Sequence, residues 1–180
     1  MDNLKSWITG GIITLVIGGT TYSFSQRDVA NNMTDDTGMT QQEAEQYVDS
    51  IKEEDMISFG ELGSNFVTDG QDLLSKAEEI DCENYEYDWE SITLSCTQGK
   101  NQLFEMGRDT KAVGLAYQKL SLDSATNSDI SNTIVTIEDL NQDLMLPVAN
   151  ILYNQADIEE IKNTNSFNKA LLETSLQKGS

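Results

Sequence analysis

The stretch KNQLFEMGRDTKAVGLAYQKLSL, residues 100–122, carries the pattern that decides the fold class. Its apolar residues recur at steps of three, four or seven, which is the spacing of one face of an α-helix. A single proline in 180 residues leaves long helices uninterrupted. We therefore predict an amphipathic helix here. Its apolar stripe consists of Leu103, Met106, Val113, Ala116, Tyr117 and Leu120.

Other segments repeat this periodicity and are joined by short polar turns. Pro147 interrupts one of them, because a proline inside a helix loses a hydrogen bond and clashes with the preceding turn. Together these segments predict an all-α fold, an antiparallel bundle of four to five helices within residues 41–178. The additional helices are expected over residues 41–56, 58–80, 128–153 with a break near Pro147, and 157–176.

The N-terminal residues 7–24, WITGGIITLVIGGTTYSF, contain no charged side chain. As a helix they would span about 27 Å at ~1.5 Å per residue, which matches the hydrocarbon core of a bilayer. We predict a single transmembrane anchor over residues 1–25. A signal peptide cleaved before Gln26 is the alternative. Both interpretations place the rest of the chain in an extracytoplasmic space.

Small residues recur every four positions within this apolar segment. Gly10, Thr14 and Gly18 would share one face of a helix. Such rows let helix backbones approach closely in membranes, so the row predicts packing against another transmembrane helix. Glycine is also common in membrane helices without any such role.

Residues 26–40 are polar, and we predict a flexible linker there. The domain that follows, 41–178, holds 27 acids and 9 bases, a net charge of −18 out of −20 for the chain. Such a surface repels nucleic acids and attracts basic proteins or divalent cations. It is also typical of a simply acidic, well-solvated face.

The chain has no histidine. Histidine-ligated zinc sites, Ser-His-Asp triads and Cys-His dyads are therefore excluded within it. Adjacent acids such as Glu138 and Asp139 point in different directions on a helix, and no acidic segment has the spacing of a calcium loop. The sequence thus predicts no catalytic set, no metal site and no cofactor.

Two cysteines, Cys82 and Cys96, bracket a loop or short hairpin that is rich in aromatic residues. An exported domain favours a structural disulfide between them, although separate buried thiols or a redox pair are alternatives. Tyr85, Tyr87 and Trp89 lie within the loop, and rings of this kind suit a partner interface. The alternative is that they pack back onto the bundle.

These features favour a membrane-anchored, non-catalytic interaction or assembly factor outside the cytoplasm. Its expected partner is another membrane or extracytoplasmic protein, and a basic one would suit the acidic surface. A sensor or small-ligand-binding helical domain that acts through a partner is the alternative.

Overall fold

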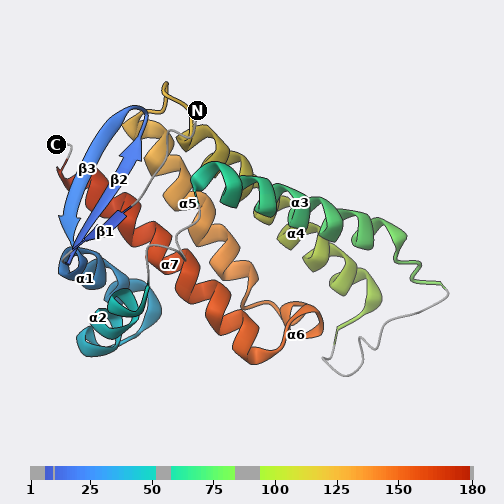
Figure 1. Ribbon diagram of the computed structural model, residues 1–180. Coiled ribbons are helices and arrows are strands. Elements are labelled where there is room, and N and C mark those ends of the chain that lie inside the picture. The colour runs from blue at the N-terminus through green and yellow to red at the C-terminus, as the bar shows by residue number, and fades with distance from the viewer. Residues whose placement is uncertain (1–6, 10, 52–57, 84–93, 179–180) are drawn as a thin grey trace.

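A computed structural model describes residues 7–9, 11–51, 58–83 and 94–178 of the chain (Figure 1). Helices make up most of these residues, so the predicted helical bundle is confirmed. The prediction of an all-α fold is wrong, because a three-stranded sheet packs against one end of the bundle.

The sheet is an antiparallel meander in the order β1-β2-β3. Its strands are β1 (Trp7–Thr9), β2 (Ile12–Ile17) and β3 (Thr20–Ser25). Side chains of β2 alternate between buried and partly exposed positions, as expected for a strand with one face on a core. The buried residues of β2 and β3 are Ile13, Leu15, Ile17 and Phe24.

The predicted N-terminal transmembrane helix is therefore wrong. Glycine pairs flank the six residues of β2, and Gly11, Gly18 and Gly19 all adopt positive φ angles. Gly18 and Gly19 form the two-residue connection between Ile17 and Thr20, where a tight hairpin requires left-handed backbone. The glycine pairs and the β-branched run between them were the sequence signal for strands.

The predicted helix-packing row does not form either. Thr14 lies in the middle of β2 and Gly18 in the turn that follows, while Gly10 lies outside the described residues. A side chain on Gly18 would collide with the carbonyl oxygen of Ala125, so this glycine lets the turn approach a helix connection. No described helix combines the length and the apolar character needed to cross a bilayer.

The predicted linker is largely helical. Ser25 begins α1 (Gln26–Thr37) with a capping box, and Thr40 begins α2 (Gln41–Ser50) in the same way. These caps satisfy backbone N–H groups that a helix start leaves free. Most residues of α1 are polar, so the sequence indicated a linker. Only a narrow side of this helix is buried. That side consists of Val29, Ala30 and Met33.

Two long helices, α3 (Phe59–Glu79) and α4 (Cys96–Leu120), form an antiparallel pair (Figure 1). Helix α3 continues through Gly70 without a break. Two pairs of glycines face each other across the contact, and each pair lies seven residues from the next on both helices. The facing pairs are Gly63 with Gly114 and Gly70 with Gly107.

These glycines set how close the two helices come. A Cβ on Gly70 would lie 2.7 Å from the carbonyl oxygen of Gly107, and one on Gly63 would lie 2.6 Å from that of Gly114. Real Cβ atoms do not approach backbone so closely, so the α3–α4 contact requires glycine at these positions. We call this row of four residues the glycine seam.

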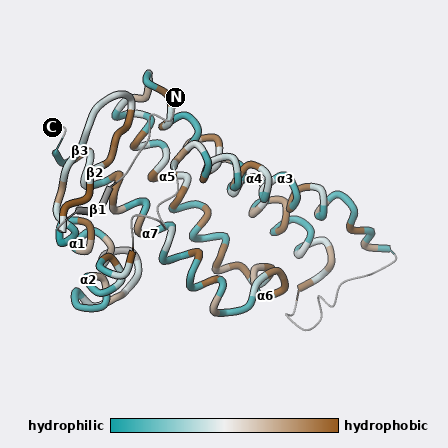
Figure 2. Tube along the Cα trace, in the orientation of Figure 1, coloured by the Kyte–Doolittle hydropathy of each residue, from teal (hydrophilic) through white to brown (hydrophobic). Residues whose placement is uncertain are grey.

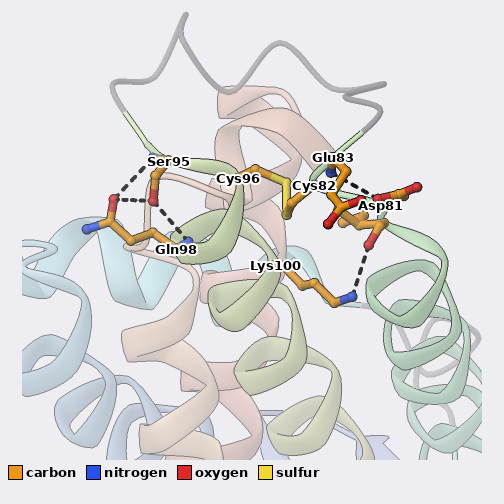
Figure 3. Close-up of a disulfide and its surroundings, with 8 residues drawn as sticks. Asp81, Cys82, Glu83, Ser95, Cys96, Gln98 and Lys100 are labelled. Carbon is orange, nitrogen blue, oxygen red and sulfur yellow. Dashed lines mark hydrogen bonds between the residues drawn. A yellow bond between two sulfur atoms is a disulfide. The ribbon is translucent and has the colours of Figure 1, made fainter.

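The disulfide Cys82–Cys96 closes the far end of the pair, as the sequence predicts (Figure 3). Cys96 is the first residue of α4, and Ser95 before it caps the helix. The ammonium group of Lys100 donates a hydrogen bond of 2.9 Å to the carbonyl oxygen of Ile80, where α3 ends. Cross-link and hydrogen bond together hold the end of α3 against the start of α4.

The last helices are α5 (Asn127–Asp143), α6 (Ala149–Leu152) and α7 (Gln155–Lys178). The break predicted near Pro147 is present as the turn between α5 and α6. Helix α7 passes between the sheet and the bundle and contacts α1 as well as α5 (Figure 1). From Asn165 to Ser175 nearly all of its residues are buried.

Two apolar cores result, and Figure 2 shows hydrophobic stretches alternating with hydrophilic ones along the helices that form them. One lies under the sheet and includes residues of α1, α2, α4, α5 and α7; we call it the sheet-end core. The other, the disulfide-end core, joins Leu73 of α3, Leu103 of α4, Leu144 after α5 and Ile158 of α7.

Polar side chains also cross the interior between α5 and α7. Lys169 is 6% exposed, and its ammonium group lies 2.7 Å from a carboxylate oxygen of Glu138 and 3.6 Å from one of Glu173. One turn earlier on α7, the amide of Asn165 donates to the side-chain oxygen of Asn141 at 2.9 Å. Buried charges need such partners, because desolvation otherwise disfavours them strongly.

The glycine seam generates the first prediction. Gly70→Ala should lower the free energy of unfolding by about 1–3 kcal/mol, because the added methyl group forces α3 and α4 apart. Gly60→Ala is the matched control, since a Cβ there meets Ser121 at an ordinary 3.5 Å. Urea unfolding followed by circular dichroism measures both. A Gly70→Ala protein as stable as the control would show that the helices do not need the close approach.

The disulfide generates the second prediction. Peptide mapping without reductant should recover Cys82 and Cys96 in one linked species. Replacing both by serine should cost about 3 kcal/mol, because the open loop gains conformational freedom in the unfolded chain. Thermal unfolding of the oxidised protein, the reduced protein and the double variant measures this. Alkylation of both thiols in untreated protein would contradict the cross-link.

Candidate functional site

A groove of about 330 Å³ opens where three parts of the chain meet. One wall is the connection between α1 and α2, another is the end of α5, and the third is the first half of α7. We call this site the α5–α7 groove. Its lining consists of Thr37, Met39, Asn141, Met145, Gln155, Ile158, Glu159, Lys162, Asn163 and Ser166.

The first wall is held by local hydrogen bonds. Helix α1 ends at Gly38, which adopts a positive φ of 69° and turns the chain. The hydroxyl of Thr37 donates to the carbonyl oxygen of Met33, and its oxygen accepts from the backbone N–H of Met39 at 3.1 Å. A glycine at this point is the common end of a helix. Met39 is a half-buried apolar residue that lines the groove and packs against the sheet-end core.

The second wall presents Met145, the most exposed of the large apolar side chains in the described residues, at 74%. Helix α5 ends at Asp143, and Leu144, which follows it, is buried in the disulfide-end core. The N–H groups of Met145 and Leu146 donate to the carbonyl oxygens of Gln142 and Asp143, at 3.0 and 2.9 Å. These bonds shape a tight turn, with Leu144 anchored inside and Met145 left outside.

The third wall is the start of α7. Asn154 caps this helix, because its side-chain oxygen accepts from the N–H of Asp157 at 3.0 Å. Asn163 and Ser166 follow along the groove, and Ile158 supplies a buried apolar base. The groove therefore combines flexible methionine side chains with amide and hydroxyl groups. Such a lining can accept both apolar and backbone groups of a bound segment.

On the other side of the α5 end lies a group of charged residues, which we call the carboxyl cluster. It contains Glu105, Arg108 and Asp109 of α4 and Asp143, the last residue of α5. Arg108 Nε lies 2.8 Å from Asp109 Oδ1. Asp143 is only 9% exposed, and its Oδ2 has no hydrogen-bond partner among the described residues.

The cluster favours a proton on Asp143. Burial raises the pKa of this carboxyl to about 7, and the negative charges of Asp109 and Glu105 act in the same direction. A hydrogen bond to Asp109 also favours the protonated form, whereas Arg108 opposes the shift. The C-terminal end of α5 adds a further unfavourable field for an anion. Asp143 is thus a carboxyl group that changes charge near neutral pH.

A second, wider hollow of about 460 Å³ lies between the start of α1 and α2. Arg27 and Glu45 face each other across it at 3.7 Å, and both are well exposed. Its lining is polar or charged apart from Gly11, so it offers no apolar anchor. We therefore base the functional argument on the α5–α7 groove.

The structure places the sequence-predicted residues as follows. Cys82 and Cys96 are joined at the end of the α3–α4 pair. Tyr85, Tyr87 and Trp89 lie outside the described residues, so their partner-binding role stays a prediction. Thr14 and Gly18 belong to the sheet. Within the described part of the chain, no three acidic or cysteine side chains converge as metal ligands.

Sequence reasoning missed the groove and the carboxyl cluster. Met145 and Asp143 stand two residues apart in QDLML, a run that reads as an ordinary helix end. Their roles depend on α4 and α7, which are distant in sequence. Lys169 gave a weak signal, because it lies between the apolar residues Phe167 and Ala170. A lysine among apolar residues is a candidate for a buried, paired charge.

Comparison of the chain with protein-family models, with curated proteins and with solved structures finds no match.

The carboxyl cluster generates the third prediction. Because the pKa of Asp143 rises from its ordinary 3.8 to about 7 on folding, the folded protein binds more protons between these pH values. The contribution of Asp143 to the free energy of unfolding must therefore fall as pH rises through this window. Asp143→Asn removes this effect, so its stability relative to wild type should increase by on the order of 2–4 kcal/mol from pH 4 to pH 8.

Urea unfolding of both proteins at several pH values measures this difference. The comparison cancels the pH dependence of the other acidic residues. Asp139→Asn is the control, because this carboxyl lies on the same helix outside the cluster. A constant stability difference between Asp143→Asn and wild type would show that Asp143 ionises normally.

Proposed function

We propose that this chain is a non-catalytic interaction or assembly factor of an extracytoplasmic space, and that it docks a segment of a partner protein in the α5–α7 groove. The observation that carries this proposal is the exposed Met145 beside a row of amide side chains. Large apolar groups next to polar ones are typical of binding surfaces.

The groove lining suits a short extended segment of protein. Met145 and Met39 offer adaptable apolar contact, and thioether side chains can adjust to different shapes. Asn141, Gln155 and Asn163 carry both donors and acceptors, which match the backbone groups of an extended chain. Their combination supports docking of a peptide that inserts one apolar side chain between the methionines.

The disulfide supports the proposed compartment. Structural disulfides persist in oxidising spaces and are rare in the cytosol. Cys82 and Cys96 are the two cysteines of the chain, and both are used in the cross-link. The sequence contains no histidine, the commonest general base near neutral pH, which supports a non-catalytic role.

The charge of the chain supports a basic partner. A net charge of −20 creates a negative field that accelerates encounters with positively charged proteins. Within the groove, Glu159 is exposed and Lys162 is half-buried. The lining itself is therefore mixed in sign, so the long-range field favours a basic partner while the groove selects the segment that docks.

A small-ligand-binding or sensor domain is the second candidate function. The groove volume of about 330 Å³ falls within the range of ligand sites, which starts near ~300 Å³. Native mass spectrometry of protein isolated from its source discriminates the two. A discrete small mass that is lost in a Met145→Trp variant favours the ligand; partner binding without such a mass favours docking.

The fourth prediction concerns Met145. A photo-reactive phenylalanine analogue at position 145 should cross-link one defined partner in living cells, and Glu at this position should abolish recovery of that partner. Position 135 provides the control, because Val135 of α5 is 53% exposed and lies outside the groove. The melting temperature should stay unchanged for both Met145→Glu and Val135→Glu, since both side chains are already largely in water.

Equal cross-linking from both positions would contradict docking in the groove. The aromatic loop offers a competing surface. Loss of the partner with Trp89→Ala, together with full recovery with Met145→Glu, would assign the contact to the loop instead.

A further inference from the structure

We propose that the α5–α7 groove binds the C-terminal residue of a partner protein. Lys162 and Asn141 hold the terminal carboxylate, and an apolar last side chain lies against Met39 and Met145. The two anchoring groups come from α7 and α5, which lie side by side (Figure 1). The inference rests on the proposed docking function, and it names the chemistry of the segment that docks.

The first step is the charge of Lys162. The chain has 31 acidic and 11 basic side chains, so a basic group has many carboxylates available to it. Lys119, Lys169 and Lys178 each contact one. Lys162 is half-buried in the groove lining, yet it forms no ion pair with any residue that the structure describes. A partly desolvated ammonium group without a counter-ion favours an anionic ligand.

The second step is the fixed orientation of Asn141, which also lines the groove. The amide nitrogen of Asn165, a residue with 0% exposure, donates to Asn141 Oδ1 at 2.9 Å. This hydrogen bond assigns the oxygen of Asn141 to the interior and leaves its Nδ2 group as a donor without a partner in the described ranges. Carboxylate oxygens only accept hydrogen bonds, so they suit a donor that is already oriented.

The third step brings the two donors together. Glu138 lies 2.7 Å from Lys169, and Asn141 bonds to Asn165, so α5 advances by about one turn while α7 recedes by one turn. Lys162 precedes Asn165 by three residues, which are neighbours on a helix surface. The antiparallel register therefore places Lys162 beside Asn141, and both residues belong to the lining of one groove.

Apolar groups complete the site. Met145 is 74% exposed, and Ile158 forms a buried base in the same groove. Met39 lines the groove from the connection between α1 and α2. An apolar side chain that covers Met145 removes apolar surface from water on both partners. The groove thus pairs a carboxylate-binding end with an apolar contact, as the last residue of a chain requires.

The charge of the chain distinguishes a protein terminus from a free carboxylate. A net charge of −20 repels a small anion at long range. A carboxylate at the end of a basic protein arrives together with positive charge, so the same field attracts it. Glu159 also lines the groove, but its side chain is exposed and water screens it. These charges favour the C-terminus of a basic partner as the occupant.

Binding of fluorescent peptides to the purified protein tests the site. Two pools of short peptides carry random sequences before a C-terminal leucine. They differ only in the last group, which is a free carboxylate in one pool and an amide in the other. Fluorescence polarisation should show saturable binding of the free-acid pool. The amide pool should bind more weakly by on the order of tenfold, because hydrogen bonds to a charged group are lost.

Two variants locate the carboxylate. Lys162→Met should remove the difference between the pools, whereas Lys76→Met should keep it. Lys76 is the matched control, because it is exposed on α3 outside the groove and its replacement changes the net charge equally. Asn141→Asp keeps the oxygen that accepts from Asn165 and replaces the free donor by a negative charge. It should weaken binding of the free-acid pool by about tenfold or more and leave the amide pool unchanged. The ratio of acid to amide binding within one protein does not depend on the fraction that is folded.

Equal binding of the two pools to the wild-type protein, or no binding of the free-acid pool, would overturn the carboxylate site. An acid preference that persists in Lys162→Met would do the same. Octanoate is the probe for a small carboxylate, and its binding without that of the free-acid pool would assign the groove to a small ligand instead. Cross-linking at position 145 tests docking independently, because it requires no terminal carboxylate, so the two proposals can fail separately.

Discussion

The close approach of α3 and α4 is the contact on which the other features depend. Four glycines are individually poor helix formers, at about 1 kcal/mol each relative to alanine. They are retained because they let two backbones meet at Gly63–Gly114 and Gly70–Gly107. The seam fixes the register of the pair, and the register in turn sets what each end of α4 touches. Its C-terminal half joins the sheet-end core, and its N-terminal half joins the disulfide-end core.

Helix α7 is the second organising element, and its sequence is unusual for a buried helix. Lys169, Thr174 and Ser175 are interior residues, yet each has a partner. Lys169 lies between two carboxylates, and the two hydroxyl groups donate to carbonyl oxygens one turn back on their own helix. Of these contacts, the one between Lys169 and Glu138 reaches α5, and together with the Asn165–Asn141 hydrogen bond it fixes how α7 is rotated against α5. That rotation places Asn163 and Ser166 in the groove.

The sequence predicts helices well and the sheet poorly, for a physical reason. The stripe from Leu103 to Leu120 is long enough for the helical period to stand out. The cross-link follows from two cysteines in a domain that is expected to be exported. The apolar run of residues 12–17 is short and continuous, so periodicity does not separate a strand from a membrane helix. The Gly-Gly pairs on either side distinguish a strand from a membrane helix, because Gly18 and Gly19 need positive φ angles in the turn. The groove could not be predicted from sequence periodicity, since its walls come from segments that are distant in the sequence.

The carboxyl cluster is hard to explain by stability alone. An apolar residue at position 143 could extend the disulfide-end core, which already holds Leu144 and Val148. Instead the chain keeps an acid there, 9% exposed and facing two further acids. Desolvation and repulsion both disfavour its charged form, so the residue weakens the fold at neutral and higher pH.

Sites where ionisation is shifted towards the working pH are candidates for function rather than packing. The cluster also lies beside the turn after α5 that carries Met145 into the lining of the groove. This coincidence of position and chemistry makes the α5 end the part of the molecule most worth testing.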